Sequence, residues 1–286
     1  MTQIAIAAPQ RTGAPAARPV ASTRGWRRLL NQLLVLAAFF LAWEIAARSM
    51  NVMFFPPISA IAMRAQQLWL SGPASSLFLT PAAIRDIGIS LYRTLLGFSL
   101  GSVVGIAIGV LIGFLPRAGA YVEPLIHFFR GIPKTALLPM FVIFLGIDDA
   151  MKIGLIVVAL FSYVTINTID GVRSVVPLQL DCCRVFGISR TRQIFSVILP
   201  SAAPTIFASL RFGLAVALAV MVVAEMYVAN SGLGYFTILS QRTFRIMDMW
   251  AGVLALGVLG NLLSIALGLM ESRVLRWHRG MQGGNV

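Results

Sequence analysis

The sequence contains little charge for its length, and acidic residues are the scarcer kind. Only 12% of its 286 residues are Asp, Glu, Lys or Arg, whereas 58% are hydrophobic and the mean hydropathy is +0.85. This balance excludes an ordinary soluble domain. Several apolar runs are also long enough to cross a bilayer. The sequence therefore predicts an all-α, polytopic membrane protein.

Side chains that could form a reaction centre are scarce as well. His127 and His278 are far apart in the sequence and offer neither metal-ligand spacing nor a catalytic triad, which argues against a membrane enzyme. Cys182 and Cys183 are adjacent, which suits neither a structural disulfide nor a metal site, so we interpret them as small apolar helix residues. The chain also lacks a Gly-rich phosphate loop followed by Lys and Ser or Thr, so it is not itself an ATPase.

The formal charge of +13 does not indicate nucleic-acid binding. The basic residues are scattered between the apolar runs and do not cluster on one face. They follow instead the positive-inside pattern of membrane proteins.

Six apolar segments are expected to span the membrane. Five are long apolar runs, at 29–47, 95–115, 153–169, 205–227 and 249–270, of which 205–227 is interrupted by Arg211 near one end and Glu225 near the other. The remaining run, 135–147, is short and contains Pro139, so it could be re-entrant. We interpret it as a kinked span that begins near Gly131, because a proline is tolerable where neighbouring helices cover the freed carbonyl.

The segments outside the spans have signatures of their own. Residues 1–24 are rich in Ala, Pro, Thr and Arg, so we expect a disordered tail, and we expect the first span to remain uncleaved. Residues 51–93 are interpreted as a loop with one amphipathic helix over 59–70. The transmembrane domain is expected over 25–280, followed by a flexible end at 281–286.

The distribution of Lys and Arg predicts the orientation. Six spans place both termini on one side, where fifteen Lys and Arg residues fall, against seven on the other side, with Arg211 inside a span. The excess predicts that both termini are cytoplasmic. His127 and Arg130 would then lie at the cytoplasmic boundary.

The second span carries a glycine at every fourth position. The five residues are Gly97, Gly101, Gly105, Gly109 and Gly113. Small residues at this spacing form a groove that lets another helix approach closely, which is how helices pack in lipid. This glycine ladder predicts close packing against another helix, in the same chain or in a second copy.

A polar stretch from Ile169 to Pro200 separates two long apolar segments and predicts two short helices joined by a turn. Pro177 suits the first position of a helix, and Gly187 suits the left-handed residue just after its end. The apolar side chains of this helix gather on one side and are expected to be uncovered at the membrane surface: Leu178, Cys182, Val185 and Phe186. A groove on a partner could cover them.

The second short helix is expected to follow the turn at Gly187. Ser189 is predicted to cap it. It is predicted to end at Leu199, because the residue before a proline is disfavoured in the α region.

These residues resemble a signature of the permease subunits of ABC importers. That signature is Glu-Ala-Ala, three residues, Gly, nine residues, Ile, one residue and Leu-Pro. The spacing is matched here by Asp181, Cys182, Cys183, Gly187, Val197, Leu199 and Pro200. The departures are a shorter acid and two cysteines in place of two alanines.

The resemblance implies a type I ABC importer permease fold, with a core over about 88–272 and a coupling loop over 171–204. In that family this loop docks on a cytoplasmic ABC ATPase dimer, which binds ATP and Mg²⁺, so no cofactor is expected on this chain. The family also implies a second permease copy and an external solute-binding protein. The alternative to a coupling loop is that residues 171–204 form an ordinary amphipathic loop between two helices.

Two further matches resemble the branch that serves sulfonates, taurine and nitrate: Ser90-Leu91-Tyr92-Arg93 and Arg130-Gly131-Ile132-Pro133. Two more resemble pairings that the family as a whole shares: Asn167-Thr168, and Ala224-Glu225 with Gly232-Leu233-Gly234. Glu225 and Asn167 are candidates for a pathway or gating role, and a structural ion pair is an equal alternative for Glu225.

The sequence therefore predicts the permease subunit of an ATP-driven importer of a small anion, in the cell membrane. One alternative is a secondary transporter or channel that works without ATP, although we find no internal repeat that would support the former. Another is the same ABC mechanism with a pyrimidine-type vitamin precursor as its substrate.

Overall fold

The computed structural model describes residues 23–276, a range that contains helices and no strand. The helices are α1 (Thr23–Met50), α2 (Ile58–Trp69), η1 (Ala74–Ser76), α3 (Pro81–Phe114), α4 (Pro116–Gly131), η2 (Lys134–Leu137), α5 (Leu138–Leu145), α6 (Asp149–Arg173), α7 (Pro177–Val185), α8 (Arg190–Gln193), η3 (Ile194–Ile198), α9 (Leu199–Val228), α10 (Leu233–Arg242) and α11 (Ile246–Val274). The all-α prediction is confirmed. The predicted disordered tail and flexible end lie outside the described residues, apart from Thr23 and Arg24, which begin α1.

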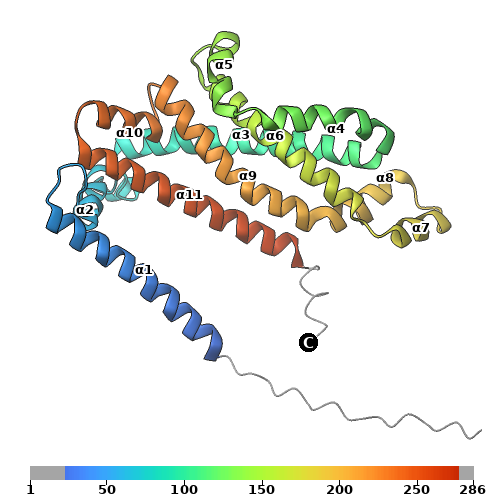
Figure 1. Ribbon diagram of the computed structural model, residues 1–286, viewed down its shortest axis with the longest axis horizontal. Helices are drawn as coiled ribbons and strands as arrows, with labels where there is room; N and C mark the ends of the chain where they lie inside the picture. The colour runs from blue at the N-terminus through green and yellow to red at the C-terminus, as the bar shows by residue number, and fades with distance from the viewer. Residues whose placement is uncertain (1–22, 277–286) are drawn as a thin grey trace, which may run out of the picture.

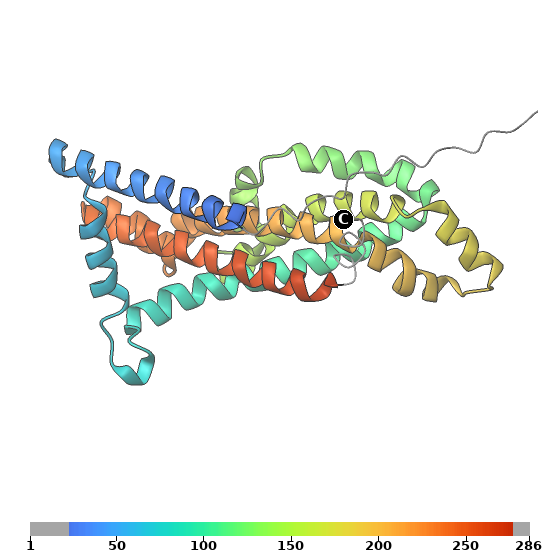
Figure 2. The same ribbon diagram turned by 90° about the horizontal axis from the view of Figure 1, so that it is seen from below.

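The bundle is elongated. Figures 1 and 2 place α7 and α8 at one end of its long axis and α2 and α10 at the other. Five segments of residues 23–276 are long and apolar enough to span a membrane, and α4 with η2 and α5 forms a sixth if this bent unit counts as one span. The helix predicted over 59–70 is confirmed as α2.

The centre of the fold is the contact between α3 and α6. A Cβ added at any of the five ladder glycines would lie within 3.0 Å of an α6 side chain, in the order Ile156, Leu160, Val164, Thr168 and Val172. Both sets of residues rise in steps of four, so the two helices run parallel and their backbones approach closely along the whole seam. The partner of the glycine ladder is therefore a helix of the same chain.

Helix α9 covers another side of α6 and runs in the opposite direction. Gly213 lies against Leu160, whereas Gly171, eleven residues further along α6, lies against Ala202. Apolar side chains from α6 and α9 form most of a buried cluster, which includes Leu155, Ile156, Leu160, Ala217 and Met221. The close packing of α3, α6 and α9 therefore forms the core of the chain.

The segment between α3 and α6 differs from the kinked span that the sequence predicts. A helix, α4, already begins at Pro116, and the axis turns by 87° between it and the η2–α5 unit. The break lies at Ile132, whose backbone is extended because Pro133 follows it. Pro139 causes no kink, since it occupies the first turn of α5, where no N–H is required.

The parallel arrangement of α3 and α6 explains this bent unit. A chain that leaves the far end of α3 must return before it can enter α6 at the near end. The unit α4–η2–α5 makes that return.

The predicted loop over 51–93 is wrong in its last part, because α3 already begins at Pro81. The Thr80 hydroxyl caps this helix by accepting a hydrogen bond from the N–H of Ala83 at 3.1 Å.

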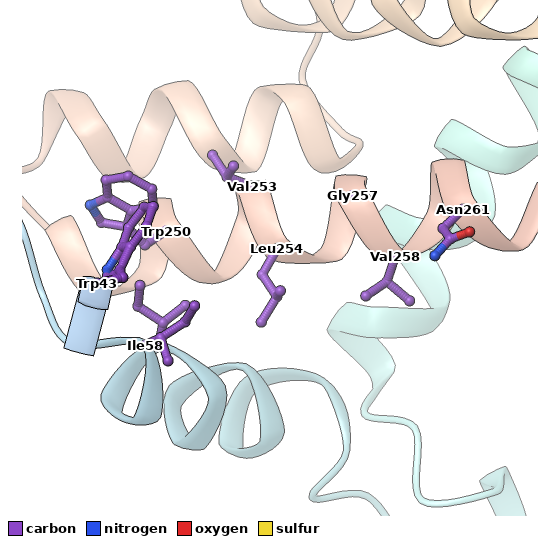
Figure 3. A pocket seen from close by; sticks show the side chains of 9 residues that line it. Trp43, Ile58, Trp250, Val253, Leu254, Gly257, Val258 and Asn261 are labelled. Atoms are coloured by element: carbon purple, nitrogen blue, oxygen red, sulfur yellow. The ribbon is translucent and has the colours of Figure 1, made fainter. Parts of the chain in front are cut away.

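Helix α1 contacts the rest of the fold mainly near its end. Trp43 stacks on Phe55 and meets the ring of Trp250 edge-on, and its indole donates to the carbonyl of Pro56. Before Trp43, α1 diverges from α11 (Figure 1), and its apolar side chains from Leu30 onward are mostly exposed. Figure 3 shows the apolar groove of about 340 Å³ that begins at the two tryptophans and continues along α11 to Asn261.

Candidate functional site

The first short helix of the coupling loop is α7, and its end has the geometry that the sequence predicts. Gly187 has φ +64°, and it follows Phe186, the last residue of the turn. The N–H of Ile188 donates to the carbonyl of Cys183 at 2.9 Å, and the N–H of Gly187 donates to that of Arg184 at 3.1 Å. This pair of bonds is a Schellman motif, which satisfies the last carbonyls of the helix and turns the chain sharply.

The apolar face of α7 is uncovered. Leu178, Val185 and Phe186 are 69%, 82% and 79% exposed, and Cys182 is exposed beside them. Cys183 faces the other way and is buried. Asp181 lies on the exposed side of the helix and forms an ion pair with Arg184 at 2.8 Å. Both cysteines were predicted to be small apolar helix residues, but only Cys183 is buried, whereas Cys182 is exposed.

The second part of the coupling loop departs from the prediction. The Ser189 side chain makes no capping hydrogen bond, and α8 is a single turn. A π-helical turn, η3, follows it, and the chain continues through Leu199 and Pro200 into α9 with Leu199 in the α region. We attribute this continuity to the wider π turn, which displaces the carbonyl that the ring of Pro200 would otherwise meet.

The last three residues of the signature connect the coupling loop to the core. Val197 and Leu199 pack against the buried cluster that contains Ile198 and Ala202, and Pro200 lies in the first turn of α9. A displacement of α7 would therefore reach α9 through a helix that is continuous from residue 190 to residue 228.

Glu225 lies at the opposite end of α9 and is fully buried. Its carboxylate forms an ion pair with Arg93 at 2.7 Å and accepts a hydrogen bond from the Ser90 hydroxyl at 2.8 Å. It also accepts the N–H of Gly234 at 2.9 Å, which is one of the unpaired donors at the start of α10. The carboxylate thus joins α3, α9 and α10 in one polar cluster.

Arg93 is only 3% exposed and all its nitrogens are engaged. Besides Glu225 it binds Asp149 at 2.7 Å and donates to the carbonyl of Ser231 at 2.9 Å. The structural ion pair is therefore the alternative for Glu225 that the geometry favours, because a saturated carboxylate has no free position for a solute. Arg93 was not identified from the sequence as the ion-pair partner of Glu225. The available signal was general, because an acid buried near one end of a span is usually paired with a cation at the same depth in the membrane.

Gly232 allows this cluster to close. Its φ is +110°, and an added Cβ would collide with the carboxylate of Glu225. The neighbouring N–H of Leu233 donates to the Ser90 oxygen at 2.9 Å, so the turn 232–234 wraps around the acid.

Asn167, the other candidate for a pathway role, does not join this cluster. It lies near the other end of α6, where its side-chain amide donates to the carbonyl of Tyr163 one turn earlier at 2.8 Å. Within residues 23–276 no three His, Cys, Asp or Glu side chains gather closely enough to hold a metal ion.

Comparison with known proteins decides the family. The model of the family described as binding-protein-dependent transport system inner membrane component matches residues 101–276, which include the coupling loop and Glu225. The chain belongs to this family. The protein named "Putative aliphatic sulfonates transport permease protein SsuC" of Bacillus subtilis (strain 168) is 32% identical over 96% of both chains. The taurine transport system permease protein TauC of Escherichia coli (strain K12) is 31% identical over 90% of this chain and 94% of its own.

More distant relatives extend the comparison. The bicarbonate transport system permease protein CmpB of Synechococcus elongatus is 26% identical over 88% of this chain and 92% of its own. Among solved structures, the inward-facing MetNI methionine ABC transporter matches with a TM-score of 0.58 and 20% identity, over 66% of this chain and 94% of the matched chain. An amino acid ABC transporter matches with a TM-score of 0.52 at 17% identity, over 75% of this chain and 96% of its own. These structures share the fold, which confirms the type I importer architecture.

The family establishes the general function. The chain is a permease subunit of an ABC importer and not an enzyme, and ATP hydrolysis belongs to a separate subunit. An importer of this family works with an ATPase and a substrate-binding protein.

Proposed function

We propose that the chain forms the membrane passage of an importer for a small sulfonate-type anion. The observation that carries this proposal is the similarity to SsuC, which extends over 96% of both chains. Similarity to TauC supports the same substrate class, since taurine is also a small sulfonate. CmpB, at lower identity, makes a planar inorganic anion the second candidate.

The charged groups of the spans support a passage that binds its solute weakly. Arg93 and Glu225 neutralise each other, and Arg211 forms an ion pair with Glu271 at 2.5 Å. Either arginine would hold a passing anion only by giving up its partner, and for Arg93, which is 3% exposed, separating the pair is costly. Selectivity would then reside mainly in the external binding protein.

We further propose that two copies of the chain enclose the passage. The glycine seam and the α6–α9 cluster fill the interior of one chain, so a passage has to lie outside this core. A second copy would provide the opposite wall. Each copy would offer its α7 face to one subunit of a cytoplasmic ATPase dimer, which binds ATP and Mg²⁺.

The unequal number of Lys and Arg residues on the two sides of the membrane also supports an orientation with both termini in the cytoplasm. The structure changes this count at two residues. Arg130 and Lys134 lie at the far end of α4, about 24 Å from its start at the 1.5 Å rise of an α-helix, so they leave the cytoplasmic count. Counted on the opposite side, they leave thirteen basic residues against nine, and the excess still lies on the side of the termini. Reporter fusions after Ala47 should be external and fusions after Pro177 internal, and an external signal at Pro177 would contradict the docking proposal.

Uptake measurements test the substrate. Cells that carry the cognate ATPase and binding protein should take up labelled alkanesulfonate or taurine only when this gene is present. Labelled nitrate and a pyrimidine precursor serve as the competing substrates. Unchanged uptake of alkanesulfonate, taurine and nitrate would refute the anion assignment, and uptake that persists with a hydrolysis-deficient ATPase would refute the coupling.

A further inference from the structure

A cavity of about 470 Å³ lies behind the coupling loop, between the ends of α3 and α6 and the segment formed by α7, α8 and η3. Its charged lining consists of Arg173, Arg184 and Arg190, and no acidic residue lines it. Three guanidinium groups around one opening create a positive potential that attracts an anion.

The three arginines are not equally occupied. Arg173 is held by Glu123, whose two oxygens lie 2.6 and 3.1 Å from its terminal nitrogens. Arg184 has one carboxylate partner, Asp181, on the exposed side of α7. Arg190 makes no ion pair among residues 23–276, so its planar donor fork is available to a ligand.

Apart from Gln193, whose side-chain amide donates to the carbonyl of Ile188 at 2.7 Å, the rest of the lining is apolar. Val172, Val175 and Ile198 are buried side chains that line it, and they belong to the core cluster shared by α6 and α9. A free inorganic ion would interact with the rim and leave these side chains uncovered. A ligand with a phosphate at one end could bind the arginines at the rim, while its apolar body covered the apolar side chains of the lining.

The cavity lies on the reverse side of α7 from the exposed apolar face. Leu180 and Arg184 line the cavity, whereas Leu178 and Val185 do not line it and are exposed. A protein that covers the exposed face therefore need not fill the cavity.

We propose that this cavity binds the headgroup phosphate of an anionic phospholipid, with Arg190 and Arg184 as its ligands. The bound lipid would brace α7 against the ends of α3 and α6. Binding itself does not depend on the transported substrate, and only the leaflet from which the lipid enters rests on the orientation proposed above.

Native mass spectrometry of the full-length permease tests this site, with phosphatidylglycerol and phosphatidylcholine as probes. The wild type should retain phosphatidylglycerol preferentially, and Arg190→Gln should lower this retention about fivefold, as expected for the loss of one basic contact near a membrane surface. Arg192→Gln is the matched control, because Arg192 lies on the same short helix but does not line the cavity. Arg190→Lys should recover part of the retention.

Three outcomes would overturn the proposal. Equal retention of phosphatidylglycerol by Arg190→Gln and Arg192→Gln would show that the cavity does not hold the lipid. Displacement of the lipid by inorganic phosphate at equal concentration would assign the site to the free ion. Loss of ATPase binding by Arg190→Gln in membranes of phosphatidylcholine alone would make Arg190 a contact of the ATPase instead.

Discussion

Glycine serves opposite purposes in the seam between α3 and α6 and in the coupling loop. In the seam, Gly105 is needed because it is small: an added Cβ would lie 2.9 Å from the Cβ of Val164. In the coupling loop, Gly187 has open space around it, with nothing within 4 Å of an added Cβ, and is needed because its φ is positive. The first glycine serves packing and the second serves the direction of the chain.

This difference separates two kinds of structure in one molecule. The seam is complete within the chain, since α6 fills the groove that the glycines leave. The coupling loop is incomplete by itself, because Leu178, Val185 and Phe186 remain exposed on α7. Substitutions in the complete part should therefore destabilise the fold, and substitutions in the incomplete part should affect coupling to the ATPase.

The largest loss of stability is expected from Arg93→Met. The variant leaves Glu225 buried without its cation, which costs about 3–5 kcal/mol in comparable sites. Thermal unfolding of the detergent-purified permease should shift to markedly lower temperature. The double variant Arg93→Met, Glu225→Met should recover much of the loss. A stable Arg93→Met protein that no longer transports would instead indicate that the ion pair works as a gate.

Gly105→Leu should have the next largest effect. The new side chain would push α3 away from Val164, and overpacking of this kind costs about 1–3 kcal/mol or more. Val103→Leu provides the control, since Val103 lies on the same helix and is 66% exposed. Thermal unfolding should distinguish the two variants, and equal unfolding temperatures would mean that the seam tolerates separation.

Gly187→Val should leave the fold nearly intact and impair coupling. A β-branched residue is strongly disfavoured at φ +64°, so the turn after α7 should change direction. ATPase binding or substrate-stimulated hydrolysis should fall while insertion and thermal unfolding remain close to the wild type. Gly187→Asn is the matched control, because Asn tolerates the left-handed region. Full stimulation from the Val variant would show that this turn does not set the docking geometry.

The sequence was sufficient for features that depend on local rules. Glycines spaced by four predict a close helix contact, and Pro177 with Gly187 predicts the bounds of α7, because both signals act within a few residues. The identity of the partner was not predictable in the same way. Spacing alone does not say that Val164 and its neighbours on α6 fill the groove, since that depends on the topology.

The failures of prediction have physical causes too. A proline normally ends a helix at the residue before it, yet Leu199 stays helical because a π turn precedes Pro200. The partner of Glu225 lies 132 residues earlier in the chain, so no local pattern could identify Arg93. Long-range pairing and small changes of helix geometry both depend on neighbours that a single segment does not reveal.

The smallest effect is expected from replacing Cys182 and Cys183 together by alanine. Cys182 is exposed on α7 and contributes little to packing, and Cys183 is buried but loses only its sulfur atom. Alanine is also a better helix former than cysteine, which offsets part of the lost contact. We therefore expect transport and thermal unfolding close to the wild type.

The two single-cysteine variants sharpen this prediction, because only one thiol lies on the face assigned to the ATPase. A maleimide reagent should label Cys182 rapidly in the Cys183→Ala variant and label Cys183 slowly in the Cys182→Ala variant. Addition of the ATPase should slow the labelling of Cys182 and leave that of Cys183 unchanged. Rapid labelling of Cys182 in the assembled transporter would place the ATPase contact elsewhere on the coupling loop.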